Sequence, residues 1–210
     1  TDLRLGDWQR IRLAVLFADI RGFTALSETM TPEENFRFIN SYLSRMGPVI
    51  RRHRGFIDKY IGDGIMALFP RSAQNALDAA IAMQKEMQVY NRHRANCGYA
   101  PVRIGIGIHF GDTIIGTIGE NERIEVTVIS DTVNVASRLE SLSKRYGAGI
   151  LVSGDVLAQL QKTKNIRCVI PTACAPKANK TRWISMKFST ASSQKSSARS
   201  SKTGVFCRKH

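Results

Sequence analysis

The sequence has no run of about 18 consecutive apolar residues, the length that a membrane-spanning helix needs, and no signal peptide opens it. Its four cysteines form neither a Cys-x-x-Cys pair nor the Cys/His spacing of a zinc site. We therefore expect no membrane span in this fragment, no disulfide framework and a cytoplasmic location. Apolar residues make up 43% of the 210 positions, which suffices for a buried core and excludes wholesale disorder. The chain begins with Thr1 rather than Met, so we interpret it as a piece of a longer protein.

Acidic residues are absent after Asp155, which makes the end of the chain strongly basic. Residues 161–210 hold 12 of the 31 Lys and Arg and none of the 17 Asp and Glu, so most of the net charge of +14 lies there. A basic, Ser-rich segment cannot bury apolar surface, and we predict that residues 189–202 are disordered. Such a tail binds nucleic acid only without specificity, so we expect no specific nucleic-acid partner. We divide the chain into a linker (1–10), a folded catalytic domain (11–167) and a basic, atypical tail (168–210).

Apolar patterns predict strands and helices in alternation within the folded part. Residues 12–20 are apolar at nearly every position, as in a central strand. The Thr-Pro-Glu-Glu segment at residues 31–34 has the capping box that begins a helix. Paired strands with helices between them predict an α/β sandwich, with a mixed or antiparallel sheet covered by helices on one face. The other predicted elements are strands at 102–110 and 113–118 joined by a Gly111-Asp112 hairpin turn, strands at 56–60, 65–69, 124–129 and 149–152, and helices at 73–91 and 131–146.

Two aspartates lie where a site for a cation could form. Asp19 ends the apolar strand, and Asp63 lies in the turn between the strands at 56–60 and 65–69. Each alone also fits an ordinary capping or turn residue. Held side by side on one sheet, two carboxylates repel, and a divalent cation removes that cost; oxygen ligands favour Mg²⁺ or Mn²⁺ over zinc. Lys59 lies four residues before Asp63, and the residues alone leave open whether both serve one site.

A third polar group lies on the helix at 131–146. Asn134 and Arg138 are four residues apart and share one helical face, where they could donate to phosphate oxygens. The alternative is a solvated face on which Arg138 pairs with a glutamate. The sequence has no GxxxxGK[ST] loop, no dinucleotide fingerprint and no GxSxG elbow. A two-carboxylate, phosphate-handling site remains, which is typical of two-metal phosphoryl or nucleotidyl transfer.

Four segments carry a resemblance to a known family. FADIRGFTALSE, DKYIGDGIMALFP, GIGIHFGDTIIGTIG and DTVNVASRLE resemble, in order and spacing, the motifs of class III nucleotidyl cyclase catalytic domains over about residues 13–153. The sequence is most similar to the cyanobacterial bicarbonate-responsive soluble adenylyl cyclases. The resemblance implies a ferredoxin-like α+β sandwich that converts ATP to 3′,5′-cyclic AMP and pyrophosphate. It also implies two Mg²⁺ (or Mn²⁺) ions per site and a head-to-tail homodimer with composite sites.

The resemblance also implies a role for each candidate residue. Guanylyl cyclases usually carry Glu and Cys at the two base-recognition positions, so the Lys and Thr found here favour ATP. Thr in place of the Asp of many adenylyl cyclases fits the bicarbonate-responsive group. One protomer would supply the metal ligands, and its partner the residues that bind base and ribose. Metal would be held by Asp19, Ile20 and Asp63; the phosphates would lie against the backbone of Ile20, Arg21, Gly22, Phe23 and Thr24; Lys59 and Thr127 would bind adenine, Asn134 would orient the ribose, and Arg138 would stabilise charge on the α-phosphate.

The sequence departs from the family pattern at its end. Family members continue into a hairpin with a phosphate-binding Lys in a Val-Lys-Gly-Lys-like segment, and this chain lacks that segment. Back-translation of residues 177–188, read two nucleotides into the first codon, allows a segment that resembles the family's last strand. We therefore interpret the tail after about Cys168 as a frameshifted reading, which the encoding DNA would decide. The missing Lys keeps open the alternative of a catalytically weakened nucleotide-binding or dimerisation module. A guanylyl cyclase is a separate alternative, against which Lys59 and Thr127 argue.

Overall fold

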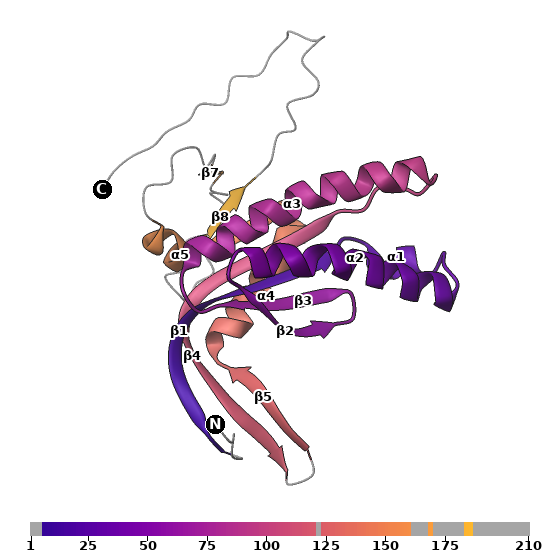
Figure 1. Ribbon diagram of the computed structural model, residues 1–210. Helices are drawn as coiled ribbons and strands as arrows, with labels where there is room; N and C mark the ends of the chain where they lie inside the picture. Colours follow the sequence, from indigo (N-terminus) through magenta and orange to yellow (C-terminus); the bar gives the residue numbers. More distant parts are fainter. Residues whose placement is uncertain (1–5, 121–122, 161–167, 170–182, 187–210) are drawn as a thin grey trace, which may run out of the picture.

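The computed structural model describes residues 6–120, 123–160, 168–169 and 183–186, which form one sheet with helices packed on it (Figure 1). No helix in these ranges is both long and apolar enough to cross a membrane. The strands are β1 (Trp8–Ile20), β2 (Phe56–Ile61), β3 (Gly64–Phe69), β4 (Ile104–Glu120), β5 (Arg123–Ile129), β6 (Ile150–Ser153), β7 (Cys168–Val169) and β8 (Trp183–Met186). The helices are α1 (Phe23–Ser27), α2 (Pro32–Arg52), α3 (Ala73–Asn96), α4 (Asp131–Arg145) and α5 (Gly154–Gln159).

The sheet is mixed, as the sequence predicts. Its strand order is β2-β3-β1-β4-β6-β8-β7, and β5 pairs with β4 outside this path. All pairings are antiparallel except the parallel one between β4 and β6. β1 lies between β3 and β4 and is buried on both faces along its second half, which explains its continuous apolar pattern. The predicted fold class is therefore confirmed.

The prediction of helices on one face only is wrong. One face of the sheet carries α2 and α3, which pack on the larger apolar core together with Ala14, Leu16 and Ala18 of β1. The alternate side chains of β1, Leu13 and Val15, point to the other face and pack in a smaller cluster that includes Val133 and Ala136 of α4. The sheet is thus sandwiched between helices, and α4 lies on the face opposite α2 and α3.

The predicted hairpin turn at Gly111-Asp112 is also wrong, because β4 runs straight through it. Gly111 pairs with Leu13 of β1 and Asp112 with Arg12, so the ladder is unbroken. A Cβ on Gly111 would lie 2.6 Å from Oγ1 of Thr132, so this glycine permits the close approach of α4 rather than a turn. The hairpin forms instead between β4 and β5, which begins to pair where Glu120 meets Arg123.

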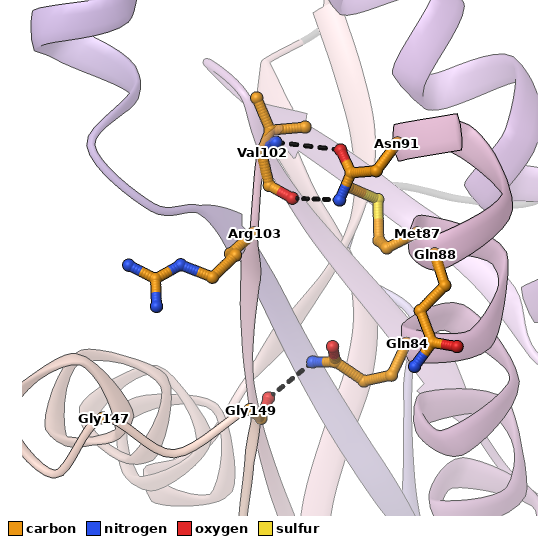
Figure 2. Close-up of a pocket in the computed structure, with 8 residues that line it drawn as sticks. All are labelled: Gln84, Met87, Gln88, Asn91, Val102, Arg103, Gly147 and Gly149. Atoms are coloured by element: carbon orange, nitrogen blue, oxygen red, sulfur yellow. Dashed lines mark hydrogen bonds between the residues drawn. The ribbon is translucent and has the colours of Figure 1, made fainter. Parts of the chain in front are cut away.

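Polar side chains of α3 fasten that helix to the sheet around a pocket of about 380 Å³ (Figure 2). The Asn91 side chain accepts from the N–H of Val102 at 2.9 Å and donates to its carbonyl at 2.8 Å. The Gln84 amide donates to the carbonyls of Ile104 at 3.1 Å and Gly149 at 2.8 Å. These amides satisfy backbone groups at the starts of β4 and β6, so the pocket has an architectural role.

The sheet extends beyond the predicted domain boundary at residue 167. β8 pairs antiparallel with β6 from Ile150↔Met186 to Ser153↔Trp183, and β7 pairs with β8. Residues 168–169 and 183–186 therefore pair with the sheet, and the division of the chain into domain and tail stays a prediction. The predicted disorder of residues 189–202 concerns positions outside the described residues.

Candidate active site

The two predicted metal-binding aspartates lie together at one end of β1. Asp19 occupies the penultimate position of β1, and Asp63 lies in the turn between β2 and β3, where Gly62 has a φ of +61°. The antiparallel pairing of β1 with β3 brings this turn to the end of β1. There Oδ2 of Asp63 accepts a hydrogen bond of 3.0 Å from the N–H of Ile20. The sequence-predicted group of Asp19, Ile20 and Asp63 is thus one cluster.

The electrostatics of this cluster favour a bound cation. Burial, together with the hydrogen bond and charge of Asp19, raises the pKa of Asp63 to about 7. Tyr42 of α2 interacts electrostatically with both aspartates; it is fully buried, and its hydroxyl has no hydrogen-bond partner within the described part of the chain. Burial, and then the charges of Asp19 and Asp63, raise the pKa of Tyr42. A divalent cation would relieve the repulsion between the two carboxylates.

The ligand chemistry of the cluster fits Mg²⁺ or Mn²⁺. No group of three or more His, Cys, Asp or Glu side chains that could hold a metal occurs among the described residues. Two carboxylates with a neighbouring backbone carbonyl do not complete an all-protein cage. They suit an ion that keeps waters and takes its remaining ligands from substrate phosphates, as Mg²⁺ commonly does.

The two predicted base-recognition residues are also in contact. Nζ of Lys59 on β2 donates to Oγ1 of Thr127 on β5 at 3.1 Å. Thr127 is buried, whereas Lys59 is about one-third exposed at 35% of its side-chain surface. Nζ also lies 3.3 Å from Oε1 of Glu125 and 3.5 Å from Oδ2 of Asp58. Glu125 is absent from the predicted site residues, although strand alternation places it on the same face as Thr127, which follows two residues after it.

The Lys59 and Asp63 groups use different neighbours. Lys59 reaches β5, whereas Asp63 reaches the backbone at the end of β1. No hydrogen bond or ion pair joins Lys59 to Asp63 in the ranges that the structure covers. Within the chain, the carboxylate cluster and the Lys59–Thr127 pair are therefore two separate groups.

Asn134 and Arg138 lie on the solvent side of α4. Both are exposed, and neither makes a hydrogen bond or ion pair with another described residue. Their exposure agrees with the alternative of a solvated helix face, but the Arg138–glutamate pair that it includes is absent among the described residues. The nearby Glu140 binds Arg21 instead, with 2.6 Å between Nη1 and Oε1. Two donors four residues apart therefore remain available to an external anion.

In the segment that follows β1, the backbone rather than a charged side chain is available to a ligand. The Arg21 side chain is directed to α4, and Gly22 has a φ of +69°, a conformation that other residues rarely adopt. Phe23 stacks on Phe38 of α2, with 6.3 Å between ring centroids. Thr24 is exposed. The segment from Ile20 to Thr24 is thus held by its flanks, next to the Asp19–Asp63 cluster.

A family model described as the adenylate and guanylate cyclase catalytic domain matches residues 9–184. The chain belongs to this family. An adenylate cyclase of Anabaena cylindrica is 47% identical over 164 residues, which cover 76% of this chain and 33% of that protein. Adenylate cyclase 1 of Rhizobium meliloti is 34% identical over 164 residues, with 75% and 25% covered. The chain therefore spans a third or less of the length of these relatives.

Solved structures of cyclase domains share the fold. The adenylyl cyclase CyaB from P. aeruginosa has a TM-score of 0.77 and 33% identity, with 88% of this chain and 98% of that chain covered. The guanylyl cyclase Cya2 has a TM-score of 0.71 and 30% identity, with 85% and 92% covered. Because this fold occurs in both an adenylyl and a guanylyl cyclase, the fold alone does not distinguish ATP from GTP, and the base-recognition residues must do so.

Proposed function

We propose that this cyclase domain converts ATP to 3′,5′-cyclic AMP and pyrophosphate. The observation that carries the proposal is the contact between Lys59 and Thr127. The pairing edge of adenine presents one ring-nitrogen acceptor and one amino donor, which suit an ammonium donor beside a hydroxyl acceptor. The same edge of guanine presents a ring N–H, which would face the ammonium as donor against donor. The adenylate cyclases of Anabaena cylindrica and Rhizobium meliloti support this proposal as relatives.

The residues divide the chemical work as follows. Asp19, Asp63 and the Ile20 carbonyl would hold two Mg²⁺ or Mn²⁺ ions, whose chemistry when bound is to neutralise phosphate charge and acidify the ribose 3′-hydroxyl. The backbone from Ile20 to Thr24 positions the triphosphate. Asn134 orients the ribose, so that the 3′-hydroxyl faces the α-phosphorus. Arg138 donates to the α-phosphate oxygens as charge builds on them. We assign no general base.

A head-to-tail homodimer is part of the proposal. In each protomer the Asp19–Asp63 cluster and the Lys59–Thr127 pair are separate, as described above. The β4–β5 hairpin exposes four large apolar side chains, which is typical of a surface that packs against another protein. We propose that one protomer supplies Asp19 and Asp63, and that its partner supplies Lys59, Thr127, Asn134 and Arg138. The four apolar side chains are Ile114, Ile118, Val126 and Ile129.

A product assay tests the function and the nucleotide. With Mn²⁺ or Mg²⁺, we expect cyclic AMP from ATP to exceed cyclic GMP from GTP by at least about ten-fold in kcat/KM, because mismatched hydrogen bonds to the base are costly. The double substitution Lys59→Glu and Thr127→Cys should reverse the preference. Specific activity should fall when the protein is diluted. Tight ATP binding without any cyclic product would contradict the proposal. The same assay with added bicarbonate tests whether this domain responds to bicarbonate.

The Asp63 cluster also predicts a pH dependence of stability in the metal-free protein. The pKa of Asp63 is about 7 in the folded state and 3.8 for the unperturbed group, so folding takes up a proton between these values. Stability from this group is therefore complete below pH 3.8 and is lost as the pH rises through 7. Asp63→Asn should raise the melting temperature by a few degrees, on the order of 3 °C, at pH 8 and by less at pH 5. Asp112→Asn is the control, and an equal effect of Asp63→Asn at both pH values would refute this assignment.

A further inference from the structure

The Arg21 guanidinium is inserted between the sheet and α4. Its Nη1 lies 2.6 Å from Oε1 of Glu140, and its Nη2 donates to the Glu140 carbonyl at 3.3 Å and to the hydroxyl of Ser143. The two charged side chains are only 15% and 13% exposed. By contrast, the Arg10–Asp112 pair on the same sheet is 69% and 52% exposed. Buried, multiply bonded ion pairs constrain geometry far more than exposed pairs do.

The surrounding residues form a seat for this guanidinium. A Cβ on Gly105 would lie 1.3 Å from Nη2 of Arg21, so only a glycine at this point of β4 leaves room for the side chain. Ser143 is fully buried, and its hydroxyl donates to the Glu140 carbonyl at 2.6 Å. The N–H of Arg21 itself donates to the carbonyl of Arg103 at 2.8 Å. The backbone of Arg21 is therefore fixed by the residue that precedes β4, and its side chain by α4.

The charges of the pair depend on each other. Burial raises the pKa of Glu140, and the neighbouring Arg21 opposes that rise. Removal of Arg21 would leave a largely buried carboxylate without its cation, and removal of Glu140 would leave the guanidinium without its anion.

The position of Arg21 in the chain connects this seat to the active site. Ile20, the preceding residue, donates its N–H to Asp63, and Gly22, the following residue, makes the left-handed turn into α1. We propose that Arg21 and Glu140 are positioning residues that hold the backbone from Ile20 to Thr24 against the triphosphate. The inference rests on the proposed function, because that function places phosphate on this backbone. Neither side chain touches the substrate in this proposal.

Kinetics of matched variants test the pair. Arg21→Met and Glu140→Gln should each lower kcat about ten-fold with KM changed less than two-fold, because a small displacement of reacting groups costs rate more than affinity. Arg21→Lys, which restores the charge but not the fork, should recover part of the loss. Arg10→Met, which removes the exposed pair, is the matched control and should leave both constants unchanged. Equal losses in Arg21→Met and Arg10→Met would overturn the proposal.

Gly105→Ala provides an independent test that keeps both charges. The added methyl group displaces the guanidinium, so this variant should match Arg21→Met in kcat. The double variant Gly105→Ala/Arg21→Met should lose no more than either single variant, because both remove the same interaction. Additive losses would show that Gly105 acts independently of Arg21, and would refute the claim that Gly105 makes room for the guanidinium.

Hydrogen exchange separates failure of the pair from failure of the proposed function. In the metal-free protein, the amides of residues 20–24 should exchange at least about ten-fold faster in Arg21→Met and Gly105→Ala than in wild type, and at the wild-type rate in Arg10→Met. Faster exchange in a domain that makes no cyclic nucleotide would refute the cyclase proposal and leave the pair standing. Unchanged exchange with unchanged kcat in a cyclic-AMP-forming domain would refute the pair alone. A melting curve for each variant identifies any that does not fold.

Discussion

Asp63→Ala should abolish cyclic AMP formation, with a fall in kcat/KM of about 10³-fold or more, since charge stabilisation by metal ions supplies several kcal/mol to such reactions. Asp63 is one of only two carboxylates in the cluster at the end of β1. Its removal leaves Asp19 as the single charged ligand. Mn²⁺ binding, followed by paramagnetic resonance in the presence of a non-hydrolysable ATP analogue, should weaken in parallel with the rate.

A matched aspartate distinguishes this loss from a general loss of negative charge. Asp112 on β4 is exposed and lies 3.2 Å from Arg10 and 3.8 Å from Arg12, both of which are exposed. Asp112→Ala should therefore change activity less than about two-fold, because exposed pairs contribute little. Asp63→Ala should fold normally, since it removes a repulsive carboxylate. Full turnover in Asp63→Ala would show that the metal assignment is wrong.

The fold could be predicted where the pattern is local. The apolar run of β1 and the capping box of α2 are both confirmed: the N–H of Glu34 donates to Oγ1 of Thr31 at 3.2 Å, and the Glu34 carboxylate accepts from the N–H of Thr31 at 2.9 Å. The errors arise where a tertiary contact decides. The Gly111-Asp112 pair is typical of a turn, but in the structure Gly111 lies within β4 and α4 packs against it. The sequence alone does not show that a helix packs at this position. Whether helices cover one face of the sheet or both likewise depends on the face against which α4 packs.

The candidate site shows the same division. The proximity of Asp19 and Asp63 could be predicted, because Asp19 lies near the end of an apolar strand and Asp63 in the turn between two strands. The partners Glu125, Tyr42 and Glu140 could not, since each gains its importance from a neighbour that is distant in sequence: Glu125 from Lys59, Tyr42 from the two aspartates and Glu140 from Arg21. Glu140 is four residues before Lys144 and two after Arg138 on α4, which predicts a solvated helix residue rather than a buried partner of Arg21. The residues that carry the chemistry could thus be identified from sequence motifs, whereas the residues that orient them could be identified only from the fold.

Two inactive variants should restore activity when mixed, because the proposed sites are shared between protomers. Asp63→Ala damages only the metal-binding half of a site, and Arg138→Ala damages only the half on α4. A mixed dimer would then have one site with both defects and one site with none. Random exchange of subunits between equal amounts gives about half mixed dimers, each with one intact site of two, so specific activity should reach about a quarter of wild type.

The control for this experiment is a mixture with both defects in the same half. Asp19→Ala mixed with Asp63→Ala should stay inactive, since every site in every dimer lacks one carboxylate. Restoration in the first mixture but not in the second is expected only if the aspartates and Arg138 act across the interface. If all residues of a site came from one protomer, neither mixture could exceed the activity of its components, and the head-to-tail arrangement would have to be abandoned while the metal assignment stood. The separation of the Asp63 and Lys59 contacts within one protomer is the structural reason to expect restoration.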